Sequence, residues 1–152
     1  MTKRAHRSDA ERIREILEIR ELQTGEAKQV LGSATAREAA CRERFDAAVE
    51  ESEAVRRAWQ GYFGSAHPAP ALLQDFRTEL IRISETRAGI AKQLDDARAE
   101  RERCERAVQA AILREDLARR ISRKLYARLA QQNEERRLQT AEERTSYQWS
   151  QR

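Results

Sequence analysis

The chain contains few of the residues that build compact cores. Its 152 residues include only eight aromatic side chains, five glycines and two prolines. Aromatic residues make up 5% of the chain and charged residues 37%, against a usual charged fraction of roughly 25%. Because the remaining apolar residues are mostly Ala, Leu, Ile and Val among many Glu and Arg, this composition excludes a thick globular core and favours long helices.

Several other features are also missing. The two cysteines, Cys41 and Cys104, have no paired spacing, which excludes a disulfide framework or a zinc site. No stretch alternates β-branched and polar residues, so strands are not expected. No apolar run reaches the roughly 18 residues needed to cross a bilayer, and the first residues have no apolar signal core. We therefore expect a cytoplasmic location.

Residues that could support catalysis are equally scarce. The two histidines, His6 and His67, have no histidine, cysteine or carboxylate partner at helical spacing. The chain also has no phosphate-binding loop, nucleophile elbow or dinucleotide-binding turn. The sequence therefore predicts no catalytic residues, no metal site, no cofactor and no small-molecule substrate, and we expect that the protein is not an enzyme.

Charge is abundant but nearly balanced. The chain has thirty basic and 26 acidic residues, which occur in mixed order and give a net charge of +4. This balance makes nucleic acid an unlikely partner through bulk charge, although a local basic patch stays open.

Apolar residues recur at steps of three and four along two long stretches, which predicts two helices with an apolar seam. The first seam has ten apolar positions out of fourteen: Ile13, Leu17, Arg20, Thr24, Ala27, Leu31, Ala34, Glu38, Cys41, Phe45, Ala48, Ser52, Val55 and Trp59. The second has thirteen out of seventeen: Leu73, Phe76, Leu80, Ile83, Arg87, Ile90, Leu94, Ala97, Arg101, Cys104, Val108, Ala111, Glu115, Ala118, Ser122, Leu125 and Leu129.

The ends of these helices are predicted from capping and breaking residues. Ser8 and Glu11 form a capping box, so the first helix begins near residue 8. Glycines and prolines at 61, 64, 68 and 70 end it near residue 61, leave a loop at about 62–70, and let a second helix run over about 71–145 before a polar C-terminal tail. Gly25 and Gly32 lie inside the first helix and could break it.

A short connection between two long seamed helices predicts antiparallel neighbours. The expected fold is therefore one all-α domain, a long antiparallel two-helix coiled-coil hairpin whose second helix is the longer. With the turn centred near residue 66, the numbers of facing residues add up to about 132, so that Trp59 would face Leu73. The C-terminal residues would then extend beyond the start of the first helix.

Four aromatic residues, which we call the aromatic tip, gather around the predicted loop: Trp59, Tyr62, Phe63 and Phe76. Trp59 and Phe76 could simply close the apolar seam. Tyr62 and Phe63 are expected in a glycine-flanked loop with little core to cover them. Exposed aromatic clusters are typical of protein interfaces, so the aromatic tip is predicted to bind a protein partner.

A second candidate lies at the opposite end of the predicted hairpin. Its basic residues, which we call the basic base, are Lys3, Arg4, Arg7, Arg119, Arg120, Arg123, Lys124 and Arg128. They could be an ordinary solvated helix surface, or a docking site for an acidic protein or a nucleic-acid backbone. The C-terminal segment carries Leu138, Tyr147 and Trp149, and it could fray or become ordered inside a partner.

With its charged helical hairpin, aromatic turn, longer second helix and polar tail, the chain resembles the central-stalk proteins of type III secretion systems, of the flagellar FliJ and injectisome YscO type. The resemblance covers the whole length. It implies that the end with both termini enters a hexameric secretion ATPase, so that Arg119, Arg120, Arg123 and Lys124 would face the ATPase. The aromatic tip would face the export gate or a chaperone.

The resemblance therefore implies a non-enzymatic stalk or adaptor that couples a secretion ATPase to the export gate, peripheral to a membrane complex but not inserted in the membrane. Two alternatives remain. One is a nucleic-acid-associated coiled-coil protein that uses the basic base. The other is a homo-oligomeric structural scaffold.

Overall fold

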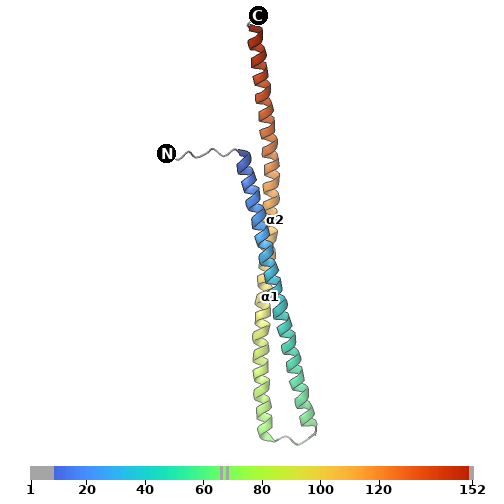
Figure 1. Ribbon diagram of the computed structural model, residues 1–152. Coiled ribbons are helices and arrows are strands. Elements are labelled where there is room, and N and C mark those ends of the chain that lie inside the picture. The colour runs from blue at the N-terminus through green and yellow to red at the C-terminus, as the bar shows by residue number, and fades with distance from the viewer. Residues whose placement is uncertain (1–8, 66, 68, 151–152) are drawn as a thin grey trace, which may run out of the picture. The chain divides into compact units, whose positions relative to one another are not determined.

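The computed structural model describes residues 9–65, 67 and 69–150. These residues form two α-helices, α1 over Asp9–Ser65 and α2 over Pro70–Ser150 (Figure 1). Among the described residues only His67 and Ala69 lie outside the helices. The predicted all-helical fold, with the second helix longer than the first, is confirmed.

Each helix contributes to two compact units. Unit 2 comprises Ala27–Val108, in which the second half of α1 packs against the first half of α2. Unit 1 comprises Met1–Glu26 and Gln109–Arg152, in which the start of α1 packs against a later part of α2. The helices are antiparallel in each unit. In unit 2 Arg37 pairs with Glu100 while Trp59 bonds Glu79, and in unit 1 Ala10 contacts Tyr126 while Glu21 pairs with Arg119.

The predicted seam forms the contact between the helices in both units. All fourteen seam positions of α1 are buried or half-buried, and so are all those of α2 except Leu73, Arg87 and Leu125. The seam hydroxyls of Thr24 and Ser52 donate to the carbonyl oxygens of Arg20 and Val49, so these polar groups are satisfied within their own helix. The three-four periodicity therefore identified the inner face of each helix correctly.

The predicted end of the first helix was wrong. The helix continues through Gly61 and Gly64 to Ser65, and no glycine in the described chain has the positive φ of a left-handed cap. Tyr62 and Phe63 are therefore helical, not part of a loop. A glycine inside a helix costs only about 1 kcal/mol, and the ring of Trp59 stacks on that of Phe63 one turn later, which favours continuing the helix.

The start of α2 agrees with proline chemistry. Pro70 is its first residue, a position where the missing N–H has no intrahelical partner to lose. The carbonyl oxygen of Ala69 accepts hydrogen bonds from the N–H groups of Leu72 and Leu73. At its other end α2 runs to Ser150, beyond the predicted boundary near 145, so that much of the predicted tail is helical.

The later turn also changes the register that the sequence predicted. The indole N–H of Trp59 donates to Glu79, the Trp59 ring packs against Phe76, and Glu38 pairs with Arg101. Facing residues therefore have numbers that add up to values near 137, not 132, because the chain turns between Ser65 and Pro70, later than the predicted centre near residue 66. Trp59 accordingly faces Phe76 and Glu79, and the prediction that it faces Leu73 was wrong.

The glycines inside α1 do not break it. Gly25 and Gly32 are exposed helical residues, and a Cβ atom added at either one would meet no atom within 4 Å. Packing therefore does not require glycine at these positions. Each glycine therefore only adds to the entropy that the chain loses on folding into a helix.

We expect Gly25→Ala and Gly32→Ala to stabilise the protein by about 1 kcal/mol each, since alanine fits and lowers the entropy lost on folding. Thermal and urea unfolding followed by circular dichroism would measure the gain. Gly25→Pro is the matched control and should destabilise the helix, because proline removes a hydrogen bond and clashes with the preceding turn. An unchanged or lower unfolding midpoint in both alanine variants would contradict the expectation.

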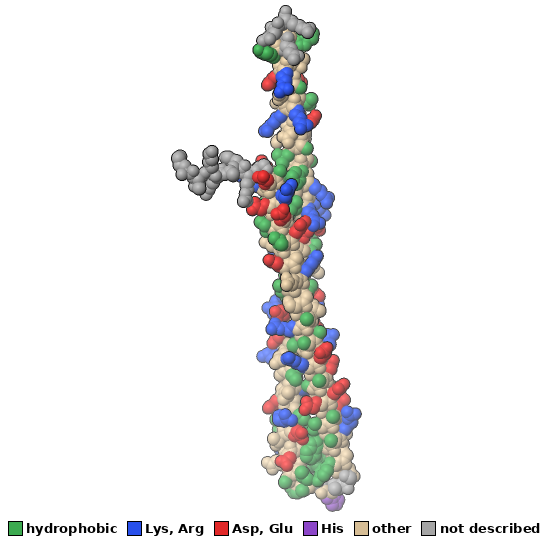
Figure 2. Space-filling view, in the orientation of Figure 1, with side chains coloured by type: hydrophobic (Ala, Val, Ile, Leu, Met, Phe, Trp, Pro, Cys, Tyr) green, Lys and Arg blue, Asp and Glu red, His purple; other side chains and the backbone are tan. Residues whose placement is uncertain are grey.

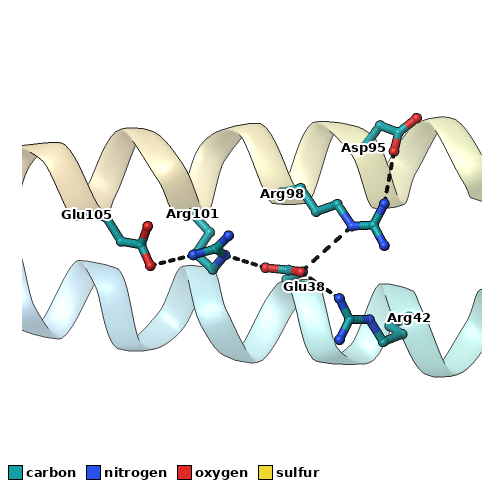
Figure 3. A network of polar contacts seen from close by, with 6 residues as sticks. All are labelled: Glu38, Arg42, Asp95, Arg98, Arg101 and Glu105. Carbon is teal, nitrogen blue, oxygen red and sulfur yellow. Dashed lines mark hydrogen bonds and ion pairs between the residues drawn. The ribbon is translucent and has the colours of Figure 1, made fainter.

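A polar network crosses the seam in unit 2 (Figure 3). The carboxylate of Glu38 accepts from Arg101 Nε at 2.6 Å and pairs with Arg42 and Arg98 at 3.1 and 3.8 Å. Arg101 also pairs with Glu105. The side chain of Glu38 is only 12% exposed. Its hydrogen bond, followed by that of Glu105, raises the pKa of Arg101, so this arginine stays charged well beyond neutral pH.

Glu38 and Arg101 are both seam residues, and each also has partners outside the seam: Arg42 and Arg98 for Glu38, and Glu105 for Arg101. Removing one partner leaves a charge in the contact between the helices, whereas replacing both by leucine restores an apolar seam. We therefore expect Glu38→Leu and Arg101→Leu each to lower the unfolding temperature, and the double variant to recover or exceed the parent value. Calorimetry of all four proteins would test this order. Additive losses would show that the two residues act independently.

Candidate partner-binding surfaces

The structure brings all four residues of the aromatic tip together in unit 2. The ring of Trp59 is the centre, with centroids 4.8 Å from Phe76, 5.5 Å from Phe63 and 6.1 Å from Tyr62. Phe63 also lies edge-on against Phe76 at 5.4 Å and against Tyr62 at 5.8 Å. Trp59, Tyr62 and Phe63 meet because spacings of three and four residues share one helix face. Phe76 reaches them from α2.

Exposure differs within the aromatic tip. Trp59, Phe63 and Phe76 are half-buried, which agrees with closure of the seam. Tyr62 is 42% exposed and presents part of its ring to solvent. Figure 2 shows hydrophobic side chains gathered over this end of unit 2. The cluster therefore combines a packed centre with an accessible edge, the arrangement expected of an interface anchor.

The sequence did not identify one member of this surface. The indole N–H of Trp59 donates to a carboxylate oxygen of Glu79 at 2.9 Å, which fixes the orientation of the ring. Glu79 appears in the sequence as one of many helical glutamates. Only the correct register would have placed it opposite Trp59.

The basic base is only partly brought together by the described chain. Lys3, Arg4 and Arg7 lie outside the described residues. The other five members follow one another on α2 in unit 1: Arg119, Arg120, Arg123, Lys124 and Arg128. The prediction that the N-terminal basic residues lie beside those of α2 can therefore be followed only for the α2 side.

Arg119 differs from its neighbours because it is paired. Its guanidinium bonds Glu21 of α1 at 3.0 Å and Glu115 at 2.6 Å. These contacts, first of all the hydrogen bond that Arg119 donates to Glu21, raise the pKa of Arg119. Because this pKa is raised, the charge pair is present at neutral and acidic pH as far as the carboxylates stay ionised, and the arginine loses its proton only in strongly alkaline solution. Arg119 therefore joins the two helices and is less available to a partner.

The other four basic residues are accessible. Arg120, Arg123, Lys124 and Arg128 are exposed, and none forms an ion pair with a described residue. Arg120, Lys124 and Arg128 follow at four-residue steps, so they form a ridge along α2. This ridge is the part of the basic base that could bind an acidic surface or a phosphate backbone.

The C-terminal part of α2 is helical but open to solvent. Every side chain from 130 to 147 is exposed, including those of Leu138 and Tyr147, and Trp149 is exposed as well. The expectation that these residues extend without cover from the first helix agrees with this exposure. Among all the described residues, no group of three or more histidine, cysteine or acidic side chains is placed to hold a metal ion.

Comparisons with known proteins add no relative. The chain matches no protein family, no curated protein and no solved structure. No helix among the described residues is long and apolar enough to cross a membrane.

Trp59 should support the folded state of unit 2 as well as any interface. We expect Trp59→Ala to cost about 2 kcal/mol, below the roughly 3–5 kcal/mol typical of fully buried aromatics, because this ring is only half-buried. Tyr62→Ala should cost less than about 1 kcal/mol, since that ring is more exposed. Urea unfolding of both variants would measure the difference. Equal losses would show that Tyr62 is part of the packed centre.

Proposed function

We propose that the protein is a non-enzymatic stalk or adaptor of a type III secretion apparatus, an antiparallel coiled-coil hairpin that links a hexameric secretion ATPase to the export gate. The observation that carries this proposal is the aromatic tip, four rings assembled from both helices where the chain turns, with Tyr62 accessible. The resemblance to the central-stalk family supplies the identity of the partners.

The coiled-coil part of the proposal is supported by the buried seam. All but three of the seam residues at steps of three and four are buried or half-buried, in both units, and this is the repeat that knobs-into-holes packing requires. A structure with this seam offers no enclosed interior, so its activity would consist of binding at the outer surface. Bridging two partners is a role that such a structure can perform without chemistry.

The basic ridge supports the ATPase end of the proposal. Arg120, Lys124 and Arg128 present accessible positive charge at regular spacing, which would steer and dock an acidic surface. Arg119 would contribute less, because Glu21 and Glu115 already bind it. The aromatic tip would contact the export gate, with a chaperone as a further partner.

Binding of the purified chain to a hexameric secretion ATPase would test this function. Reversing Arg120, Arg123 and Lys124 to glutamate should weaken binding at least tenfold, which corresponds to about 1.4 kcal/mol. The matched control reverses Arg77, Arg82 and Lys92, three exposed basic residues of α2 in unit 2, and should bind like the parent. The proposal would be overturned if the ATPase did not bind the parent chain, or if it bound the two triple variants equally.

The same triple variant separates this function from nucleic-acid binding. DNA affinity that falls steeply with salt in the parent chain, and is lost in the Arg120, Arg123 and Lys124 variant, would favour a nucleic-acid-associated protein. Weak DNA binding with a shallow salt dependence, together with ATPase binding, would favour the stalk.

A further inference from the structure

Exposed apolar side chains are concentrated in unit 1. Of sixteen large apolar residues that the structure describes as exposed, twelve belong to this unit. They are Ile16, Ile19, Leu22, Ile112, Leu113, Leu117, Ile121, Leu125, Tyr126, Leu138, Tyr147 and Trp149. The seam of α1 and α2 does not cover them, so unit 1 carries apolar surface that its own two helices leave in water.

The positions of these residues relative to the seam show which side of unit 1 they occupy. Glu21 and Arg119, which pair at 3.0 Å, each directly follow a seam residue in sequence, Arg20 and Ala118. Because each residue turns the helix by the same angle, residues that directly follow the seam share one side of the pair. Residues that directly precede the seam share the opposite side.

Four exposed apolar residues directly precede the seam. Ile16 and Ile19 precede Leu17 and Arg20 on α1, and Leu117 and Ile121 precede Ala118 and Ser122 on α2. They therefore lie on one side of unit 1, which we call the apolar side. The opposite side carries the Glu21–Arg119 pair and the hydrogen bond from the hydroxyl of Tyr126 to the carbonyl oxygen of Ala10.

The apolar side also carries charge. The charged residues that directly precede the seam, and so lie on the apolar side itself, are Arg12 and Glu26 on α1 and Arg114, Lys124 and Arg128 on α2. Among them, Glu26 and Arg114 flank the apolar side on α1 and on α2. The apolar side is therefore basic along α2, and Glu26 is the acidic residue of α1 that a half-turn would bring to a basic residue of a second copy.

We propose that the apolar side of unit 1 binds a second copy of this chain, in a two-fold dimer that lays α1 of one copy on α2 of the other. A two-fold axis parallel to the helices brings Ile16 and Ile19 onto the partner's Leu117 and Ile121. Glu26 of each copy then approaches Arg114 of the other. This inference does not rest on the secretion partners, although Lys124 and Arg128 of the ridge directly precede seam residues and so lie on the same side.

The mass of the full chain in solution tests the dimer. Light scattering and sedimentation equilibrium over a concentration series should show the mass of one chain rising to that of two. Leu117→Glu with Ile121→Glu should raise the dissociation constant at least tenfold, because these side chains are 58% and 49% exposed in the single chain and become buried in the dimer. Ile81→Glu is the matched control, since Ile81 is 50% exposed but belongs to unit 2, and it should dimerise like the parent.

A charge exchange tests the geometry. Glu26→Arg alone should weaken the dimer by juxtaposing like charges, and adding Arg114→Glu should restore it, because each pair joins one copy to the other. Circular dichroism should show equal helix content in every variant. The dimer is overturned if the chain has the mass of a monomer at all concentrations. It is also overturned if the unit 1 and Ile81 variants change the dissociation constant equally, or if the double charge exchange does not restore association. ATPase binding by a chain that stays monomeric would refute the dimer alone and leave the proposed function intact.

Discussion

The structure depends on mutual burial of one narrow seam. Two helices can shield only the stripe that faces the partner, and no described large side chain is fully removed from solvent. Stability must therefore accumulate from many half-buried contacts, with alanine and small hydroxyl residues allowing the helices to approach. Thr24 and Ser52 are tolerated there because each bonds its own backbone, so the seam contains polar atoms without leaving any buried one unsatisfied.

The sequence predicted this seam well because periodicity is a property of each helix alone. Ile13, Leu94 and Val108 fell on the inner face as the three-four repeat required. The helix end and the register were predicted less well, because they depend on contacts between the helices. Gly61 and Gly64 are strong breakers only when a turn uses them, and here the stacking of Trp59 on Phe63 continues the helix. An error of a few residues at the turn then shifted every facing pair.

The candidate surfaces follow the same division. Residue type was enough to select the aromatic tip and the ridge of Arg120, Lys124 and Arg128, since rare aromatics and clustered charge are visible without coordinates. The residues that contact them within the chain could not be predicted from the sequence. Glu79 beneath Trp59, and Glu21 beside Arg119, are ordinary helical glutamates until the register places them. The structure thus distinguishes Arg119, which joins the two helices, from the neighbouring basic residues, which remain accessible.

The seam pair Glu38 and Arg101 has a consequence for motion. Two helices with a seven-residue repeat can in principle slide past each other by one repeat and bury a similar stripe again. Such a slip would move Glu38 from Arg101 to a position opposite Leu94 or Val108, both buried apolar residues. The carboxylate would then lose Arg101, keep Arg42 of its own helix and face hydrocarbon, which is costly for an ion that is mostly buried. The Glu38–Arg101 pair therefore opposes sliding of α1 along α2 in unit 2 and favours the observed alignment.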